Sequence, residues 1–440
     1  MGKIKRNYLK LLLVIILAVF FIPATVHKFN LYPEEPLKGA VKEARDPLFS
    51  VKDWLSGKYQ LNKERYIDQH FGFRNTLVRI YNQYLYMFFE KANARSVIIG
   101  KSNYLFEENY IKAYFGYDFA GDSLISERIR KAMFLQDTLE SFNTTFIMVF
   151  APGKGSFYPE YLPEQYLRKN LKTNYTTYME AVNKYNLNHI DFNRYFIDNR
   201  FKSPHPLFPK HGTHWSYYGA CLASDSIIKY IESARKTDLP DIFWNEIKTD
   251  RAKYEDYDIG DGLNLLYPLE KELLAYPAVQ FESSSGKTKP SVLLVGDSFS
   301  WVLVNLGLSA SFKNIDFWYY NTEIYQIHEN TIDPPVPADS TDILAEIEKH
   351  DVVLIMAGES TLPDMGWGFI ENAFESYHSE SYREKRNKIY QAEILKLEQY
   401  IRSDSIWMAG IEKKAAERSI SIDSMITLDA QYVVRSKIRK

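Results

Sequence analysis

A serine between an apolar strand and a helix is the first group in this chain suited to nucleophilic chemistry. Residues 293–300 read Leu-Leu-Val-Gly-Asp-Ser-Phe-Ser, so Gly296 makes a turn and Asp297 and Ser298 open the helix. A serine placed there lies at the rim of a sheet, where helix N–H groups, including that of Ser298, can hold an oxyanion. Asp297 and Ser298 are also favoured helix caps, so the segment alone leaves a structural role open.

A histidine that could act as the base lies upstream. Residues 211–216 read His-Gly-Thr-His-Trp-Ser, a polar loop before a predicted helix. His214, next to Trp215, is either a packed ring or the base that takes the proton of a serine on a neighbouring loop. No cysteine or carboxylate stands near His211 and His214 at the spacing of zinc ligands, so we expect no metal.

Two charged residues follow other predicted strands. Lys154 comes after the strand 144–150 and an Ala-Pro-Gly turn, and Glu359 comes after the strand 352–356. Lys154 either contacts an anionic glycan or the oxyanion, or is an ordinary solvated lysine, which we favour. Glu359 is either a site carboxylate or an ordinary surface acid.

Apolar strands that alternate with helices must position these residues. The hydrophobic pattern predicts strands at 96–99, 104–106, 144–150, 189–192, 292–295, 315–320 and 352–356, and helices at 122–141, 164–186, 217–234 and 299–308. Such alternation predicts an α/β fold with a parallel sheet covered by helices on both faces. Ligands of such sheets bind at the carboxyl ends of the strands, and each singled-out residue falls at such an end or in a polar loop that could lie beside one.

The ends of the chain differ from this pattern. Four basic residues (Lys3, Lys5, Arg6, Lys10) precede an apolar run over 11–22, which predicts a signal anchor with the rest of the chain outside the cytoplasm. A cleaved signal peptide is the alternative, but no typical cleavage site follows. We divide the chain into a membrane segment (1–30), a linker and helical lead-in (31–95), the α/β domain (96–380) and a C-terminal helical appendage (381–440). The net charge of −2 argues against nucleic-acid binding.

The two motifs together resemble those of periplasmic alginate O-acetyltransferases and related cell-surface polysaccharide acetyltransferases, which have an SGNH-hydrolase-like fold. In that family an Asp-x-His-Trp motif precedes a serine in a Gly-x-Ser turn. Here His214–Trp215 matches the first motif and Gly296–Asp297–Ser298 matches the second. Gly100–Lys101 and the turn at 151–154 are also similar in order and spacing. The resemblance covers about residues 50–375 and implies a three-layer SGNH-like domain.

One position departs from the family pattern. The aspartate that should precede His214 by two residues is replaced by Gly212. In a catalytic triad this aspartate orients the imidazole. Three outcomes are open: a backbone carbonyl or His211 orients His214, a carboxylate from the polar run 255–262 (Asp256, Asp258 or Asp261) replaces the aspartate, or the protein is a weak or inactive relative.

The resemblance implies transfer of an acetyl group to hydroxyls of an exported polysaccharide, through a Ser298 acyl-enzyme with His214 as base. It also implies a membrane-bound O-acyltransferase as the donor partner, no cofactor, and a single-pass protein of the inner membrane with its domain in the periplasm. Trp215 and His211 are candidates for orienting or substrate contacts. Two alternatives remain: an acetylesterase of the same fold, and a non-catalytic glycan-binding subunit of an export complex.

Overall fold

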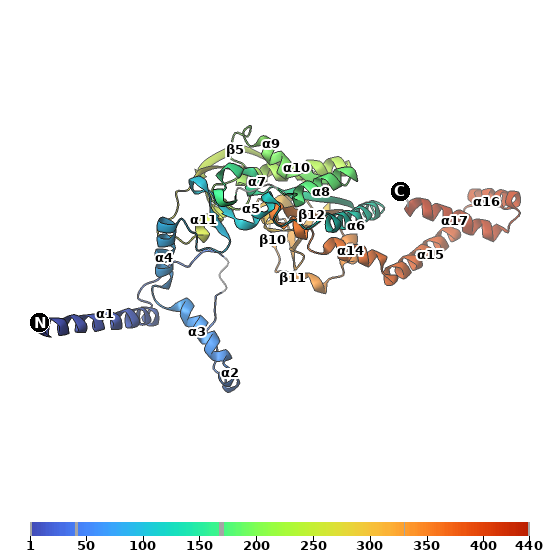
Figure 1. The fold of residues 1–440 in the computed structure, drawn as a ribbon. Coiled ribbons are helices and arrows are strands. Elements are labelled where there is room, and N and C mark those ends of the chain that lie inside the picture. The colour runs from blue at the N-terminus through green and yellow to red at the C-terminus, as the bar shows by residue number, and fades with distance from the viewer. Residues whose placement is uncertain (1, 40–42, 167–170, 330, 439–440) are drawn as a thin grey trace.

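A mostly parallel sheet forms the centre of the protein in a computed structural model that describes residues 2–39, 43–166, 171–329 and 331–438 (Figure 1). The sheet has eight strands in the order β10-β9-β8-β7-β12-β3-β4, and β11 pairs with β9. Strands β8, β7, β12, β3 and β4 run parallel, whereas β9 to β11 form an antiparallel edge. The strands are β3 (Thr145–Ala151), β4 (His189–Asp191), β7 (Ser291–Gly296), β8 (Asn314–Tyr319), β9 (Glu323–His328), β10 (Thr331–Ile332), β11 (Val336–Pro337) and β12 (Val352–Gly358).

Helices cover both faces of this sheet. Successive residues of β7 point into opposite cores: Leu294 into one and Val295 into the other. The first core is closed by α9 (Phe192–Asn199), α10 (Tyr217–Arg235) and α12 (Ser298–Asn305). The second is closed by α6 (Asp122–Glu140), α8 (Asn174–Lys184), α13 (Ile343–Glu348) and α14 (Phe369–His378). The predicted three-layer α/β class is therefore confirmed.

Two small antiparallel sheets lie outside the central one. The first pairs β1 (Val97–Ile99) with β2 (Leu105–Glu107), so the two earliest predicted strands form a hairpin of their own. The second pairs β5 (Ile242–Arg251) with β6 (Leu273–Phe281), a long arm that the sequence pattern did not reveal. The connection from β5 to β6 carries η4 (Tyr254–Tyr257) and α11 (Asp258–Gly262).

The helix predicted over 164–186 is shorter than expected. Glu164–Tyr166 forms one 3-10 turn, residues 167–170 lie outside the described part, and α8 begins at Asn174. The side chain of Thr173 accepts a hydrogen bond from the backbone N–H of Thr176. This cap fixes the start of α8 at a residue that the periodicity alone does not distinguish.

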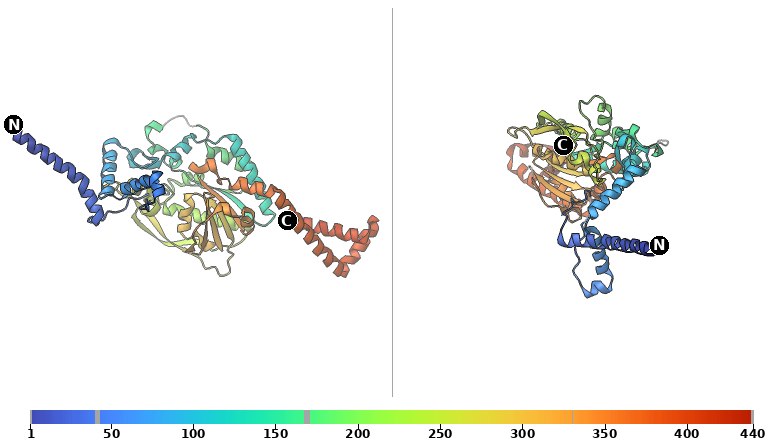
Figure 2. Two further views of the ribbon diagram at one scale, coloured as in Figure 1. Left: turned by 90° about the horizontal axis from the view of Figure 1, so that it is seen from below. Right: turned by 90° about the vertical axis from the view of Figure 1, so that its left-hand side faces the viewer.

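The N-terminal part is helical: α1 (Gly2–Phe29), α2 (Val51–Leu55), α3 (Lys58–His70) and α4 (Arg74–Phe89). Within α1, Asn7–Phe29 is long and apolar enough to cross a membrane, a property that a signal sequence shares. Helix α1 projects from the body of the protein (Figures 1 and 2). Helix α4 contacts the α11 segment, because Nδ2 of the buried Asn82 donates to the Leu263 carbonyl at 2.9 Å.

Three helices at the C-terminus extend away from the α/β body (Figures 1 and 2). They are α15 (Glu380–Ser403), α16 (Ser405–Arg418) and α17 (Ile422–Ile438). They share a separate apolar core that includes Ile401, Ile411 and Ile426. Ala415 of α16 also belongs to that core.

Candidate active site

Ser298 is held at the carboxyl end of β7 by its neighbour Asp297. One Asp297 oxygen caps α12 by accepting from the N–H of Phe299 at 3.0 Å. The other accepts from Gly358 N and Thr361 Oγ1, both at 2.7 Å. Asp297 therefore ties the serine turn to the end of β12, and Ser298, the first residue of α12, remains half-buried at the sheet edge. A Cβ at Gly296 would collide with the Ser300 hydroxyl, so a larger residue there would force that side chain to turn away.

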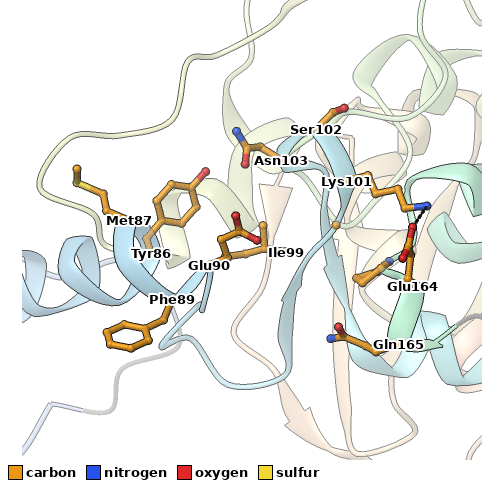
Figure 3. Close-up of a pocket in the computed structure, with 12 residues that line it drawn as sticks. Tyr86, Met87, Phe89, Glu90, Ile99, Lys101, Ser102, Asn103, Glu164 and Gln165 are labelled. Atoms are coloured by element: carbon orange, nitrogen blue, oxygen red, sulfur yellow. Dashed lines mark ion pairs between the residues drawn. The ribbon is translucent and has the colours of Figure 1, made fainter.

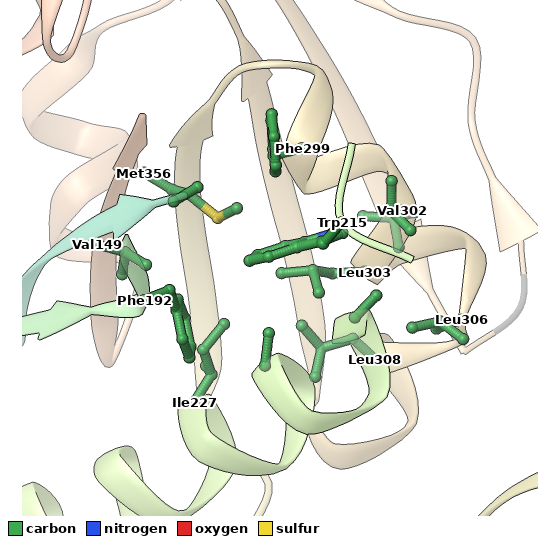
Figure 4. Packing of buried hydrophobic residues seen from close by; sticks show 14 of the residues in the cluster. Val149, Phe192, Trp215, Ile227, Phe299, Val302, Leu303, Leu306, Leu308 and Met356 are labelled. Atoms are coloured by element: carbon green, nitrogen blue, oxygen red, sulfur yellow. The ribbon is translucent and has the colours of Figure 1, made fainter. Parts of the chain in front are cut away.

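His214 reaches Ser298 from the loop before α10. Its Nε2 lies 2.9 Å from Ser298 Oγ, a hydrogen-bonding distance. The imidazole packs edge-on against the Phe299 ring, with the ring centroids 4.9 Å apart. Trp215 is fully buried and contacts the same phenylalanine from the core side, with the centroids 5.2 Å apart (Figure 4). Trp215 therefore supports the two site elements from below and has no surface for a substrate.

The other nitrogen of His214 faces an aspartate. Asp258 Oδ2 lies 3.2 Å from His214 Nδ1, which is an ion-pair distance. The geometry of this contact does not meet the criteria of a hydrogen bond. The two other acids considered from the sequence have different partners. Asp256 accepts from the N–H of Tyr217 at 3.1 Å, and Asp261 pairs with Lys38 at 2.8 Å. The described residues thus form a chain Ser298–His214–Asp258.

The acids around His214 determine its charge state. Burial lowers the pKa of His214, but Asp258, Asp297 and Glu107 outweigh that effect, so its pKa lies above the ordinary value. His211 behaves in the opposite way: burial and the nearby lysines lower its pKa to about 4. The His211 ring packs against Tyr257, 5.5 Å between centroids, so it is a neutral packed ring.

Lys154 and Glu359 are both buried, contrary to the solvated lysine that we favoured and to the surface-acid option for Glu359. Lys154 Nζ donates to the Lys210 carbonyl at 2.9 Å and to the Gly212 carbonyl at 2.6 Å, so it holds the His214 loop. Glu359 accepts from Ser156 Oγ at 2.7 Å, and burial raises its pKa to about 7. Both residues follow buried strands, and the sequence alone does not show that their side chains are buried as well.

Tyr320 is a site residue that sequence reasoning missed. It follows β8, which lies beside β7, and its backbone N–H donates to the Gly296 carbonyl at 2.9 Å. Its φ of 49° is in the left-handed region, which is uncommon for an aromatic residue. The hydroxyl interacts with the Ser298 side chain, and burial raises the pKa of Tyr320 well above its usual range, so the group remains a neutral O–H.

A possible metal-binding group lies at the other end of the sheet. Among the described residues, Asp316, Glu346 and His350 have ligand atoms within 4.8 Å of one another. His350 Nε2 lies 3.2 Å from Asp316 Oδ2, and its Nδ1 lies 2.7 Å from the Glu346 carbonyl oxygen. These contacts occupy both ring nitrogens, so the cluster is explained by buried contacts of His350 with its neighbours.

A cavity of about 710 Å³ lies between α4 and the turn that follows β1. Figure 3 shows Tyr86, Met87 and Phe89 on one side and the Lys101–Glu164 ion pair on the other. Neither Ser298 nor His214 lines it, so this hollow is separate from the Ser–His site.

Comparisons match the chain to an acetyltransferase family and to several solved structures. Residues 97–314 match the family described as the SGNH hydrolase-like domain of acetyltransferase AlgX. The solved O-acetyltransferase domain of Pseudomonas putida AlgJ is 18% identical, with 61% of this chain and 92% of that chain covered and a TM-score of 0.41. Pseudomonas aeruginosa AlgX is 13% identical, with 63% of this chain and 67% of that chain covered and a TM-score of 0.40. Bacillus cereus PatB1 with a sulfonyl adduct is 14% identical, with 62% of this chain and 99% of that chain covered and a TM-score of 0.41.

No curated protein sequence matches the chain. The segment that matches the family model contains the His214 loop, the α11 segment and the Ser298 turn. Through residues 97–314, this chain belongs to the SGNH hydrolase-like acetyltransferase family of AlgX.

Proposed function

We propose that the chain is an extracytoplasmic O-acetyltransferase that acetylates hydroxyls of an exported polysaccharide through an acetyl–Ser298 intermediate. The 2.9 Å contact between His214 Nε2 and Ser298 Oγ carries the proposal. A serine hydroxyl is a weak nucleophile until a base accepts its proton, and this contact places a base at that proton. Membership of an acetyltransferase family supports acetyl as the group transferred.

The proposed reaction has two halves. In the first, Ser298 Oγ attacks the donor's acetyl carbonyl while its proton passes to His214 Nε2. The Ser298 N–H, at the start of α12, stabilises the oxyanion, and the donor's leaving group departs with the proton from His214. In the second, a sugar hydroxyl gives its proton to His214 and attacks the acetyl–serine. The acetyl passes to the sugar, and the proton returns to Ser298 Oγ.

The apolar helix α1 supports a membrane location, with the α/β domain on the periplasmic side of the inner membrane. We further propose that a membrane-bound O-acyltransferase supplies the acetyl group to Ser298. No cofactor takes part in either half-reaction.

The acetyl content of the exported polymer distinguishes this function from its two alternatives. The host strain would carry Ser298→Ala in place of the natural chain, and the polymer would be analysed by mass spectrometry. A transferase predicts that acetyl content falls. A rise would show an esterase instead. Unchanged acetylation in the variant, with a loss only when the whole chain is deleted, would show a non-catalytic subunit and refute the proposal.

A further inference from the structure

We propose that Asp258 has taken over the role of the motif aspartate as the positioning acid of His214, and that Gly212 is the residue that makes this replacement possible. The inference rests on the proposed function and concerns how its base is oriented. Its starting point is that the family's acid position holds a glycine, while an aspartate from the distant β5–β6 connection lies against His214 Nδ1.

The motif position has no room for a side chain. Gly212 is buried, and a Cβ there would lie 2.5 Å from the Glu255 carbonyl oxygen, 2.7 Å from Pro209 Cγ and 2.8 Å from the Asp256 carbonyl carbon. Two of these three atoms belong to the backbone of the segment that leads into Asp258. The space of the missing aspartate is therefore filled by the segment that carries its replacement.

Hydrogen bonds hold the two segments at this close approach. The N–H of Gly260 donates to the His211 carbonyl at 3.0 Å, and Lys154 Nζ donates to the Gly212 carbonyl at 2.6 Å. On its far side, the α11 segment is held by Asn82 of α4 through the Leu263 carbonyl. Because partners on both sides fix the segment, Asp258 stays beside His214.

The carboxylate of Asp258 is itself oriented as a positioning acid must be. Its Oδ1 accepts from the N–H of Thr213 at 2.9 Å and from the N–H of Ile259 at 2.6 Å. These bonds fix the carboxylate, so that Oδ2 faces His214 Nδ1 at 3.2 Å. An acid at Nδ1 selects the tautomer with the proton on that nitrogen and leaves Nε2 free to accept the Ser298 proton.

The charges around His214 give the positioning role of Asp258 a measurable effect on the pH dependence of activity. Asp258, Asp297 and Glu107 all raise the pKa of His214 against burial, while Lys154 lies close enough to interact with Asp258 and Glu107. Only neutral His214 can accept a proton, so activity rises with pH through its pKa. Removing the Asp258 charge lowers that pKa, so the acidic limb of the pH profile moves to lower pH.

The test compares variants of the full chain by hydrolysis of 4-nitrophenyl acetate from pH 5 to 9. In Asp258→Asn the amide oxygen can still accept from both backbone N–H groups, so the fold is expected to survive, which thermal unfolding checks. We expect kcat to fall about 10²–10⁴-fold with little change in KM, and the acidic limb to shift to lower pH. Asp261→Asn on the same helix, whose carboxylate pairs with Lys38, is the matched control and is expected to keep the kcat of the natural chain.

A double variant tests the glycine. Adding Gly212→Asp to Asp258→Asn restores the family motif in sequence, but the close approach excludes the new side chain, so we expect no recovery of kcat. Recovery to the natural level, or an unchanged kcat and pH profile in Asp258→Asn, would overturn the inference. Ser298→Ala distinguishes a failure of the Asp258 inference from a failure of the proposed function. If Ser298→Ala hydrolyses the ester as fast as the natural chain, the proposed acetyl–Ser298 intermediate is wrong.

Discussion

Replacing Lys154 by methionine tests whether a buried ammonium group holds the catalytic loop. The change keeps an unbranched side chain but removes both hydrogen bonds, to the Lys210 and Gly212 carbonyls. Each bond from a charged donor contributes about 1.5–3 kcal/mol, and release of the buried charge offsets part of their loss. At pH 6, where Lys154 is charged, we expect the free energy of unfolding to fall by about 2–4 kcal/mol. A loop displaced by about 1 Å would also lower kcat by about 10²-fold.

The destabilisation by Lys154→Met should also depend on pH. Burial lowers the pKa of Lys154 from 10.5 to about 7 in the folded protein. Between these values the unfolded chain binds a proton that the folded chain has released, so the natural protein gains stability as pH rises. Methionine has no such gain. The free energy lost in the variant should therefore be larger at pH 9 than at pH 6.

Urea unfolding at pH 6 and pH 9, together with ester hydrolysis, measures these effects. Lys101→Met is the control, because Lys101 is exposed and its ion pair with Glu164 is at 3.7 Å, so little stability should be lost. If Lys154→Met unfolds at the same urea concentration as the natural chain at both pH values and keeps its kcat, the reasoning on the buried lysine is refuted.

Two further substitutions test the surroundings of the site. In Tyr320→Phe the ring can still pack on Trp367, 5.1 Å between centroids, while the hydroxyl beside Ser298 is lost. We expect a roughly 10-fold slower acylation burst at an unchanged melting temperature, and an unchanged burst would show that the hydroxyl has no part in acylation. In Asn82→Ala the α11 segment loses its bond to α4, so the unfolding free energy should fall by about 1–2 kcal/mol and kcat should fall with it. A loss of stability without any loss of kcat would show that α4 does not position Asp258.

Local sequence patterns were sufficient to predict the parallel central sheet and two site residues, Ser298 and His214. The strands β3, β7 and β12 are buried along nearly their whole length, so each appears as an apolar run, and such runs predict a parallel sheet. Ser298 and His214 each lie in a short segment whose residue types indicate chemistry. The structure brings these two segments together because both lie at the carboxyl edge of that sheet.

The β5–β6 arm and the place of Asp258 in the site depend on contacts between distant segments, which local patterns do not show. Strands β5 and β6 are partly exposed and flank a long connection, so neither gives a strong periodic signal. Asp258 lies in that connection with two other aspartates, Asp256 and Asp261. The sequence alone does not show which of the three contacts His214. The available signal was Gly212 itself, since a glycine in place of a functional side chain indicates close approach by another backbone.

The covalent state of Ser298 during turnover shows whether this serine carries the acetyl group. The full chain would be mixed with 4-nitrophenyl acetate, quenched in acid after one turnover, digested, and analysed by peptide mass spectrometry. We expect one added acetyl group on the peptide that contains Ser298, its loss on incubation with an acceptor sugar, and its absence in Ser298→Ala. An acetyl group on another residue during turnover, or turnover at the natural rate in Ser298→Ala, would contradict it.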